Sequence, residues 1–246
     1  MRQEHEKYTA EDHEVWQILY DRQVENLQDK AAPQYLECVE TIRPELGRDA
    51  VPDFRDVDEK LAQTGWKMEV VKGLIPVEDF FPLLAEGRFC SSTWLRSKSQ
   101  LDYLEEPDMF HDTFGHLPLL LDPVYAAFVK RFGKLGQTHI TNAKAITALQ
   151  RLYWFTIEFG LMVGEKRPLI YGAGALSSFG ESNHIYEADI EVIPYDVEKV
   201  INNHFINNEI QMRYYEIESF DQLFDSLATV EALIARGLDI EENIVR

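Results

Sequence analysis

Residues 107–118 read PDMFHDTFGHLP and carry two histidines, His111 and His116, among mostly apolar side chains. Pro107 suits the first position of a helix, and the pair of imidazoles predicts two ligands of one metal ion. A carboxylate from elsewhere would complete a set of two histidines and one carboxylate. Such a set with open coordination positions favours ferrous iron and oxygen chemistry.

The spacing of the two histidines constrains the local backbone. Residues five apart on an ideal α-helix point about 140° away from each other, so an unbroken helix separates the two imidazoles. We therefore expect the helix that starts at Pro107 to end at Gly115, which would let His116 turn back towards His111. Pro118 would then direct the chain out of the helix.

Glu158 is the candidate for the anionic ligand. The surrounding segment 151–163 is apolar or aromatic on nearly every face. The helical neighbours of this glutamate are Trp154, Phe155, Leu161 and Met162. A carboxylate buried among them without a partner costs several kcal/mol or becomes protonated, and a bound divalent cation would remove that cost. The alternative is a surface glutamate at the edge of an amphipathic helix.

Bulk properties limit the class of protein. The chain has 246 residues, of which 45% are apolar, and this suits one domain with a large core. The net charge of -19 disfavours binding to nucleic acid or to anionic membranes. The two cysteines form no CxxC pair, the N-terminus is too polar for a signal peptide, and apolar runs are too short to span a bilayer. These features predict a cytoplasmic protein.

The pattern of apolar residues, prolines and glycines predicts a single, mainly α domain with short β-strands. Helices are expected over 8–29, 33–45, 56–64, 76–86, 107–115, 123–135, 142–163, 196–203 and 220–236. Strands are expected at 68–71, 89–95 and 213–218, and the glycine-rich segment 172–180 is expected to be turn-rich with short strand pieces.

Several long motifs match one known family in order and spacing. They are GLIP at 73–76, WLR at 94–96, LDYLEEPD at 101–108, HDTFGHLPLL at 111–120, RLYWFTIEFGL at 151–161 and YGAGALSS at 171–178. With these motifs the chain resembles the pterin-dependent aromatic amino acid hydroxylases over roughly residues 8–225. Within the family it most resembles bacterial members that hydroxylate phenylalanine at ring position 4.

The resemblance implies a role for each matching residue. Iron would be held by His111, His116 and Glu158, with Tyr153 near the metal. The amino acid substrate would meet Arg96, Asp108, Trp154, Gly174 and Ser177. The tetrahydropterin would meet Gly73, Leu74, Ile75, Phe80 and Asp112. Arg96 would clamp the substrate carboxylate through a bidentate pair, held in place by Asp108, while Trp154 would form a wall for the aromatic ring.

Two positions depart from the animal members of the family. Asp112 stands where they have a glutamate, and Leu104 stands where they have a threonine that meets the substrate. Both changes look like the bacterial branch. The resemblance also leads us to expect that residues 1–246 form one catalytic domain, without a regulatory or tetramerisation domain, and that the protein is a monomer.

The activity implied is conversion of L-phenylalanine to L-tyrosine with ferrous iron, a tetrahydropterin and O2. Expected partners are the small aromatic amino acid and, indirectly, pterin-recycling enzymes. Tryptophan 5-hydroxylase, tyrosine 3-hydroxylase and phenylalanine 3-hydroxylase activities share these motifs and stay open. A different class of protein, with a closed structural zinc site or a non-catalytic metal-binding homologue, is disfavoured. No obvious fourth ligand accompanies the motif, and all three ligand residues and Arg96 are intact.

Overall fold

Helices dominate the computed structural model, which describes residues 1–101, 106–207 and 209–241. The helices are α1 Ala10–Leu27, α2 Pro33–Leu46, α3 Phe54–Leu61, α4 Val77–Ala85, α5 Pro123–Thr138, α6 Ala143–Tyr153, α7 Ala173–Ser177, α8 Phe179–Glu187, α9 Val197–Asn202 and α10 Phe220–Arg236. The strands are β1 Lys67–Val70, β2 Arg88–Ser91, β3 Leu161–Met162, β4 Leu169–Ile170, β5 Glu191–Pro194 and β6 Arg213–Ile217. The predicted class, mainly α with short strands, is confirmed. Leu104 lies outside the described residues.

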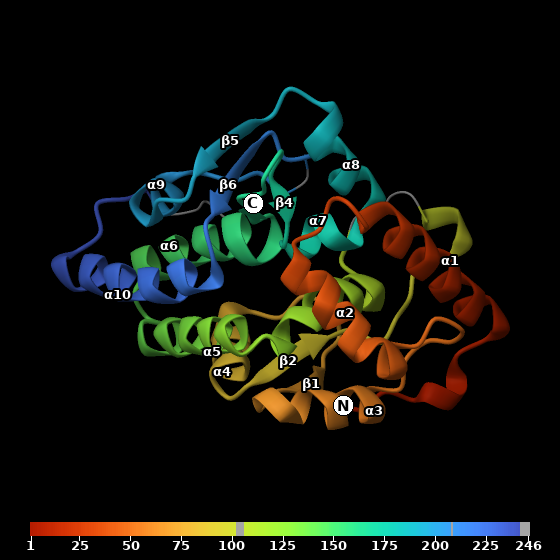
Figure 1. The fold of residues 1–246 in the computed structure, drawn as a ribbon. Helices are drawn as coiled ribbons and strands as arrows, with labels where there is room; N and C mark the ends of the chain where they lie inside the picture. The colour runs from red at the N-terminus through yellow and green to blue at the C-terminus, as the bar shows by residue number, and fades with distance from the viewer. Residues whose placement is uncertain (102–105, 208, 242–246) are drawn as a thin grey trace.

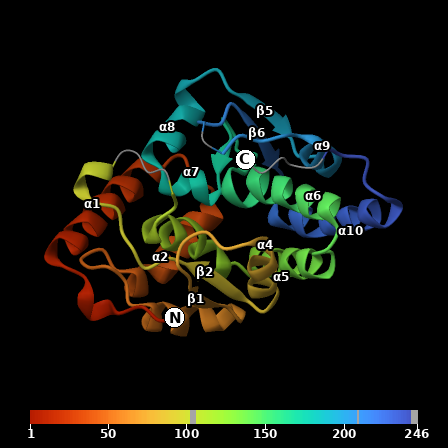
Figure 2. The ribbon, with the colours of Figure 1, turned by 180° about the vertical axis from the view of Figure 1, so that it is seen from behind.

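The strands form two small sheets on opposite sides of the helices. β1 and β2 pair in parallel, and a four-stranded sheet has the order β4-β3-β6-β5. Figure 1 shows the larger sheet above α6 and the smaller one beside α3 and α4, with α5 between them. The view from behind in Figure 2 shows the same order, with α1 and α2 along one flank.

Side-chain caps explain why many helix starts could be predicted. Thr9 and Asp12 form a capping box at the start of α1. Asp122 accepts hydrogen bonds from two backbone amides at the start of α5, where Pro123 occupies the first helical position. Ser219 caps α10 in the same way. Each cap satisfies amide groups that the helix itself leaves without partners.

Three sequence-based boundaries were wrong. The predicted helix 142–163 ends at Glu158, and the predicted strand 89–95 ends at Ser91. The segment 172–180, predicted as turn-rich, forms α7 and the start of α8. The glycines there permit close packing: a Cβ at Gly172 would lie 2.4 Å from the backbone nitrogen of Gly160.

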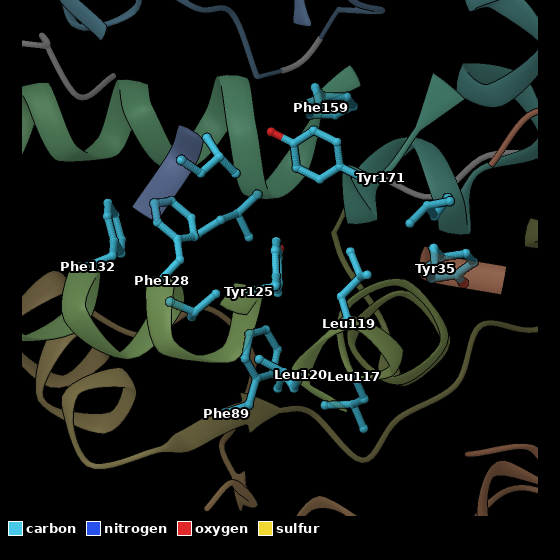
Figure 3. Packing of buried hydrophobic residues seen from close by; sticks show 14 of the residues in the cluster. Tyr35, Phe89, Leu117, Leu119, Leu120, Tyr125, Phe128, Phe132, Phe159 and Tyr171 are labelled. Atoms are coloured by element: carbon cyan, nitrogen blue, oxygen red, sulfur yellow. The ribbon is translucent and has the colours of Figure 1, made fainter. Parts of the chain in front are cut away.

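Aromatic side chains of α5 fill the centre of the core. Figure 3 shows Tyr125 with Tyr171 on one side and Phe89 on the other, and Phe128 and Phe132 further along α5. All five are at most 3% exposed. This core fixes the distance between α5 and the helices packed around it, because protein interiors have few voids into which side chains can move.

Close contact between α5 and α4 depends on glycine. A Cβ at Gly133 would lie 2.5 Å from the backbone nitrogen of Ala85, which is closer than real Cβ atoms come. At Gly136 it would lie 2.1 Å from the ring of Phe81. Backbone atoms cannot rotate away as a side chain can, so Gly133 is the stricter of the two positions.

We expect Gly133→Ala to lower the free energy of unfolding by about 1–3 kcal/mol, as overpacked cores do. Helix propensity alone would favour alanine over glycine by about 1 kcal/mol, so the packing argument predicts a net loss in spite of this gain. A neutral or stabilising result would contradict it. The measurement is urea unfolding, with Gln137→Ala on the exposed face of the same helix as control.

A half-buried carboxyl group connects α8 to β6. The hydroxyl of Tyr214 donates to Glu181 at 3.2 Å. Burial raises the pKa of Glu181 to about 7, although the hydrogen bonds from Tyr214 and the backbone of Gln211 work against this increase. Because this pKa exceeds the ordinary value of 4.5, the folded chain binds more protons than the unfolded chain between these pH values.

The contribution of Glu181 to the free energy of unfolding should therefore decrease as pH rises from about 4.5 to 7. We expect Glu181→Gln to remove this part of the pH dependence, so that the variant gains stability relative to the parent at pH 8 compared with pH 5. Denaturant unfolding at both pH values measures the difference. Equal slopes with pH in the two proteins would contradict the assignment.

Candidate metal centre

His111 and His116 lie at the two ends of a π-helix, His111–His116. The predicted helix end at Gly115 is wrong, because the chain stays helical through His116 and continues into a 3-10 turn at Pro118–Leu121. In a π-helix the backbone bonds join residues five apart, so the wider turn brings such residues to adjacent positions. Gly115 serves packing instead: a Cβ there would lie 2.8 Å from the carbonyl oxygen of Ala173.

Glu158 also comes from a π-helix. Helix α6 widens after Tyr153 into the π-helix Trp154–Glu158, and Glu158 is its last residue. Single π turns inside α-helices are rare and frequently mark functional sites. The two histidines and the glutamate therefore all lie in π-helices. A search for apolar residues at the 3.6-residue period of an α-helix does not detect such segments.

The three side chains converge on one point. The Nε2 atoms of His111 and His116 are 3.2 Å apart. A carboxylate oxygen of Glu158 lies 3.2 Å from Nε2 of His116, and the other lies 3.7 Å from Nε2 of His111. Within the described residues, these three are the one group of histidine, cysteine or acidic side chains with metal-ligand atoms mutually within 4.8 Å.

A hydrogen bond sets the tautomer of His111. Its Nδ1 lies 2.9 Å from Oγ of Ser177, and that hydroxyl donates to the carbonyl oxygen of Ala173 at 2.8 Å. The hydroxyl proton is thus used, so Nδ1–H of His111 donates to Oγ. Nε2 is left with a lone pair that faces Glu158. Outer hydrogen bonds of this kind orient the histidines of metal sites.

Electrostatics support a bound cation. Burial lowers the pKa of His111 to about 4, although the charge of Glu158 works against that decrease. Burial would raise the pKa of Glu158, but the two imidazoles and a hydrogen bond from Tyr153 hold it at about 2. At neutral pH a carboxylate and a neutral imidazole therefore present lone pairs to one small space. Donors of this kind fit a divalent metal ion.

Arg96 and Asp108 form a bidentate ion pair beside the histidines. Nε and Nη2 of Arg96 donate to the two carboxylate oxygens at 2.8 and 2.9 Å. Asp108 is fully buried, and it also accepts from the backbone amides of Arg96 and His111. The pair thus fixes a guanidinium group relative to the first predicted ligand. Fork geometry of this kind also suits recognition of a substrate carboxylate.

A cavity of about 210 Å³ opens onto the three converging side chains. Its lining includes Tyr153 and every residue predicted to meet the pterin. The latter are Gly73, Leu74, Ile75, Phe80 and Asp112. Phe80 packs edge-on against Tyr153, with ring centres 5.4 Å apart. The structure therefore brings together residues from four separate sequence motifs.

The residues predicted to meet the amino acid lie outside that lining. Ser177 contacts His111, and Gly174 belongs to the same short helix, α7. The indole of Trp154 packs on Phe159 with ring centres 4.7 Å apart. A larger cavity, of about 530 Å³, lies between α1 and α2 but contains none of the predicted site residues. The chemistry of the side chains, not cavity size, thus points to the smaller one.

Sequence reasoning missed several residues of the smaller cavity, among them Phe89, Cys90 and Ser92. The amide of Ser92 donates to Asp112 at 2.9 Å, and burial raises the pKa of that aspartate to about 7. Burial also raises the pKa of the Cys90 thiol to about 12, so it is protonated at neutral pH. Its sulfur is not among the ligand atoms that converge within 4.8 Å, so it does not supply a fourth ligand to that group. No pattern in the sequence identified these residues, because the chain brings them to the site only through the β1–β2 pair.

We expect Glu158→Ala, His111→Ala or His116→Ala to lose most bound iron while the fold persists. Each removes one of three ligand atoms, and the remaining two give a much weaker site. Iron content after dialysis measures the loss, and circular dichroism reports the fold. His139→Ala is the matched control, because this half-buried histidine is not part of the converging group. Full iron occupancy in any of the three variants would remove that residue from the ligand set.

No helix among the described residues has the length and apolar character that crossing a membrane requires. Comparison with known proteins gives more specific information. The family model of the biopterin-dependent aromatic amino acid hydroxylases matches residues 4–245. Phenylalanine-4-hydroxylase of Chromobacterium violaceum is 45% identical over 228 residues, which cover 91% of this chain and 75% of that protein. Tyrosine 3-monooxygenase of the dog is 30% identical over 96% of this chain and 48% of its own length.

Solved structures agree with these relatives. The phenylalanine hydroxylase of Chromobacterium violaceum with bound iron(III) and 7,8-dihydrobiopterin superimposes with a TM-score of 0.89 at 41% identity. That alignment covers all of this chain and 90% of the other. A structure of the same hydroxylase with iron and phenylalanine has a TM-score of 0.86 at 40% identity, covering 96% and 87% of the two chains.

Proposed function

We propose that this chain, which belongs to the biopterin-dependent aromatic amino acid hydroxylases, converts L-phenylalanine to L-tyrosine with O2. It is an iron- and pterin-dependent enzyme, in keeping with the solved relative that binds both iron and dihydrobiopterin. One observation carries the proposal. The three converging side chains His111, His116 and Glu158 open onto the cavity whose walls hold the residues predicted to meet the pterin.

His111, His116 and Glu158 would hold the iron. When bound, ferrous iron and the tetrahydropterin supply the electrons and the place at which O2 is activated. The charge of Glu158 offsets part of the charge of the metal. The hydrogen bond from His111 to Ser177 keeps the ring of the histidine in one orientation, with Nε2 directed at the metal. Two histidines and one carboxylate leave coordination positions open, as a reaction at the metal requires.

Arg96 would bind the carboxylate of the amino acid. Asp108 takes up Nε and Nη2 of the guanidinium group, and within the described residues no hydrogen bond is recorded for Nη1. That nitrogen can therefore donate to an incoming carboxylate. Because Asp108 also accepts from the amide of His111, the position of the substrate is tied to the position of the metal. Holding both partners in place is the main contribution that this protein makes.

The apolar walls of the site exclude water. The ring of Phe89 packs at a tilt against His116, with ring centres 4.7 Å apart, and the ring of Tyr153 is 6.4 Å from the same imidazole. Phe80 would stack on the pterin ring, and the backbone of Gly73–Ile75 would hydrogen-bond to it. A dry site protects reactive species from side reactions with water.

We also propose that residues 1–246 act as one catalytic domain and that the protein is a monomer in the cytoplasm. Pterin-recycling enzymes would support turnover indirectly. Support for a cytoplasmic location comes from the acidic composition and the absence of CxxC pairs. Light scattering of the purified protein tests the monomer, and a stable dimer at micromolar concentration would contradict it.

The decisive experiment is incubation of the purified protein with ferrous iron, tetrahydropterin and each aromatic amino acid, followed by identification of the product. We expect tyrosine from phenylalanine as the main product. 5-Hydroxytryptophan from tryptophan, 3,4-dihydroxyphenylalanine from tyrosine, or 3-hydroxyphenylalanine would assign another reaction of the family. Absence of any hydroxylated product, with iron bound, would indicate a non-catalytic homologue.

We expect Arg96→Ala to raise the KM for phenylalanine by roughly 10- to 100-fold, since a charge-assisted bond to a carboxylate contributes about 1.5–3 kcal/mol. Arg96→Lys should recover only part of the loss, because lysine cannot form the bidentate pair with Asp108. The KM for the pterin serves as internal control and should change little. An unchanged KM for phenylalanine in Arg96→Ala would remove this arginine from the substrate site.

A further inference from the structure

The indole of Trp154 is held on three sides. Its Nε1–H donates to Oε1 of Gln211 at 3.0 Å. One face stacks on Phe205, with ring centres 4.6 Å apart and an interplanar angle of 16°, and the ring also packs against Phe159. Stacking alone allows a ring to slide within its plane. The hydrogen bond at the edge removes that freedom and selects one orientation.

Gln211 is a buried amide with both ends engaged. Its side chain lies in the segment between α9 and β6 and is only 7% exposed. Nε2 donates to the carbonyl oxygens of Ile206 and Glu209 at 3.0 and 2.9 Å. Carbonyl oxygens only accept, and an indole N–H only donates, so the amide has a single orientation that satisfies all three groups.

The backbone of Gln211 is fixed as well. Its carbonyl oxygen and the carboxyl group of Glu181 share the single hydroxyl proton of Tyr214, at 3.0 and 3.2 Å, and its amide is hydrogen-bonded to Glu181. Tyr214 is fully buried in β6, and Glu181 belongs to α8. The acceptor for the indole is therefore anchored to two elements of regular structure, and not only to the loop that contains it.

This arrangement connects with the metal centre through α7. A Cβ at Gly174 would lie 2.8 Å from Cζ of Phe159, the ring on which the indole packs. Three residues later, Ser177 accepts from His111. The same short helix thus contacts both the metal ligand and the support of the indole, and Trp154 itself begins the π-helix that ends at Glu158.

We propose that Gln211 is a positioning residue that fixes the Trp154 indole and thereby determines which aromatic ring the amino acid site accepts. The inference rests on the proposed function, in which Trp154 forms a wall for the substrate ring. Without the acceptor, the indole N–H is left unsatisfied and the ring can turn to find another partner. A wall that turns widens the site, so an indole-sized substrate gains relative to a phenyl-sized one.

The first test compares Gln211→Met with the parent enzyme loaded with iron and tetrahydropterin. A neutral hydrogen bond contributes about 0.5–1.5 kcal/mol, so we expect the ratio of kcat/KM for phenylalanine over tryptophan to fall about five-fold. The KM for the pterin should not change. Tyr195→Phe is the matched control, because it removes one half-buried hydrogen bond, between Tyr195 directly after β5 and Ser226 in α10. It should keep the parent ratio.

Gln211→Asn is a second variant that keeps the proposal testable if Gln211→Met does not fold. It keeps an amide but moves the acceptor away from the indole by one methylene, so the same direction of change is expected. An unchanged ratio in a folded Gln211→Met or Gln211→Asn would overturn the proposal, as would an equal change in Tyr195→Phe.

A second measurement does not depend on turnover. In protein labelled with ¹⁵N-tryptophan, the indole N–H signal of Trp154, assigned by its loss in Trp154→Phe, should exchange slowly with solvent. In Gln211→Met it should shift and exchange at least several-fold faster. A parent-like signal in that variant would overturn the hydrogen bond itself. If the parent enzyme instead fails to hydroxylate phenylalanine, the proposed function fails while this signal still tests the role of Gln211 towards Trp154.

Discussion

The structure depends on the meeting of three electron-pair donors, two imidazoles and one carboxylate, in a space with little water. Glu158 has only 12% of its side chain exposed and His116 only 3%. Bringing them to one point requires the backbone to hold three side chains from two separate segments close together. Two π-helices provide that constraint, because each widens the backbone where a ligand must turn inwards.

Helix α7 joins the separate parts of the site. The π-helices approach it closely because Gly115 and Gly172 carry no Cβ. From α7, Ser177 sets the tautomer of His111, while Gly174 lies against the aromatic support of Trp154. One five-residue helix thus orients a predicted metal ligand and limits the space beside it. This explains why a glycine-rich segment occurs in a fully buried part of the chain.

A second set of contacts connects Arg96, which is predicted to bind the substrate carboxylate, with the predicted metal ligand His111. Asp108 accepts from both the side chain of Arg96 and the amide of His111, and it is fully buried. A buried carboxylate with charge-assisted bonds on both oxygens is costly to disturb. Under the proposed function, this contact would set the position of the substrate carboxylate relative to the predicted metal ligands.

Local patterns in the sequence were enough to predict the helical class, most helix starts and the candidate ligands, because caps, prolines and apolar spacing act over a few residues. The sequence also marked Glu158 as a costly charge, since its neighbours in the chain are apolar. It could not reveal how His111 and His116 meet, and the predicted break at Gly115 was wrong, because a π-helix is stabilised by packing across the core and leaves no 3.6-residue pattern. Contacts such as Gln211 with Trp154 join residues 57 positions apart. Local patterns cannot predict such contacts, because they form only when the path of the chain into the β-sheet places the two residues side by side.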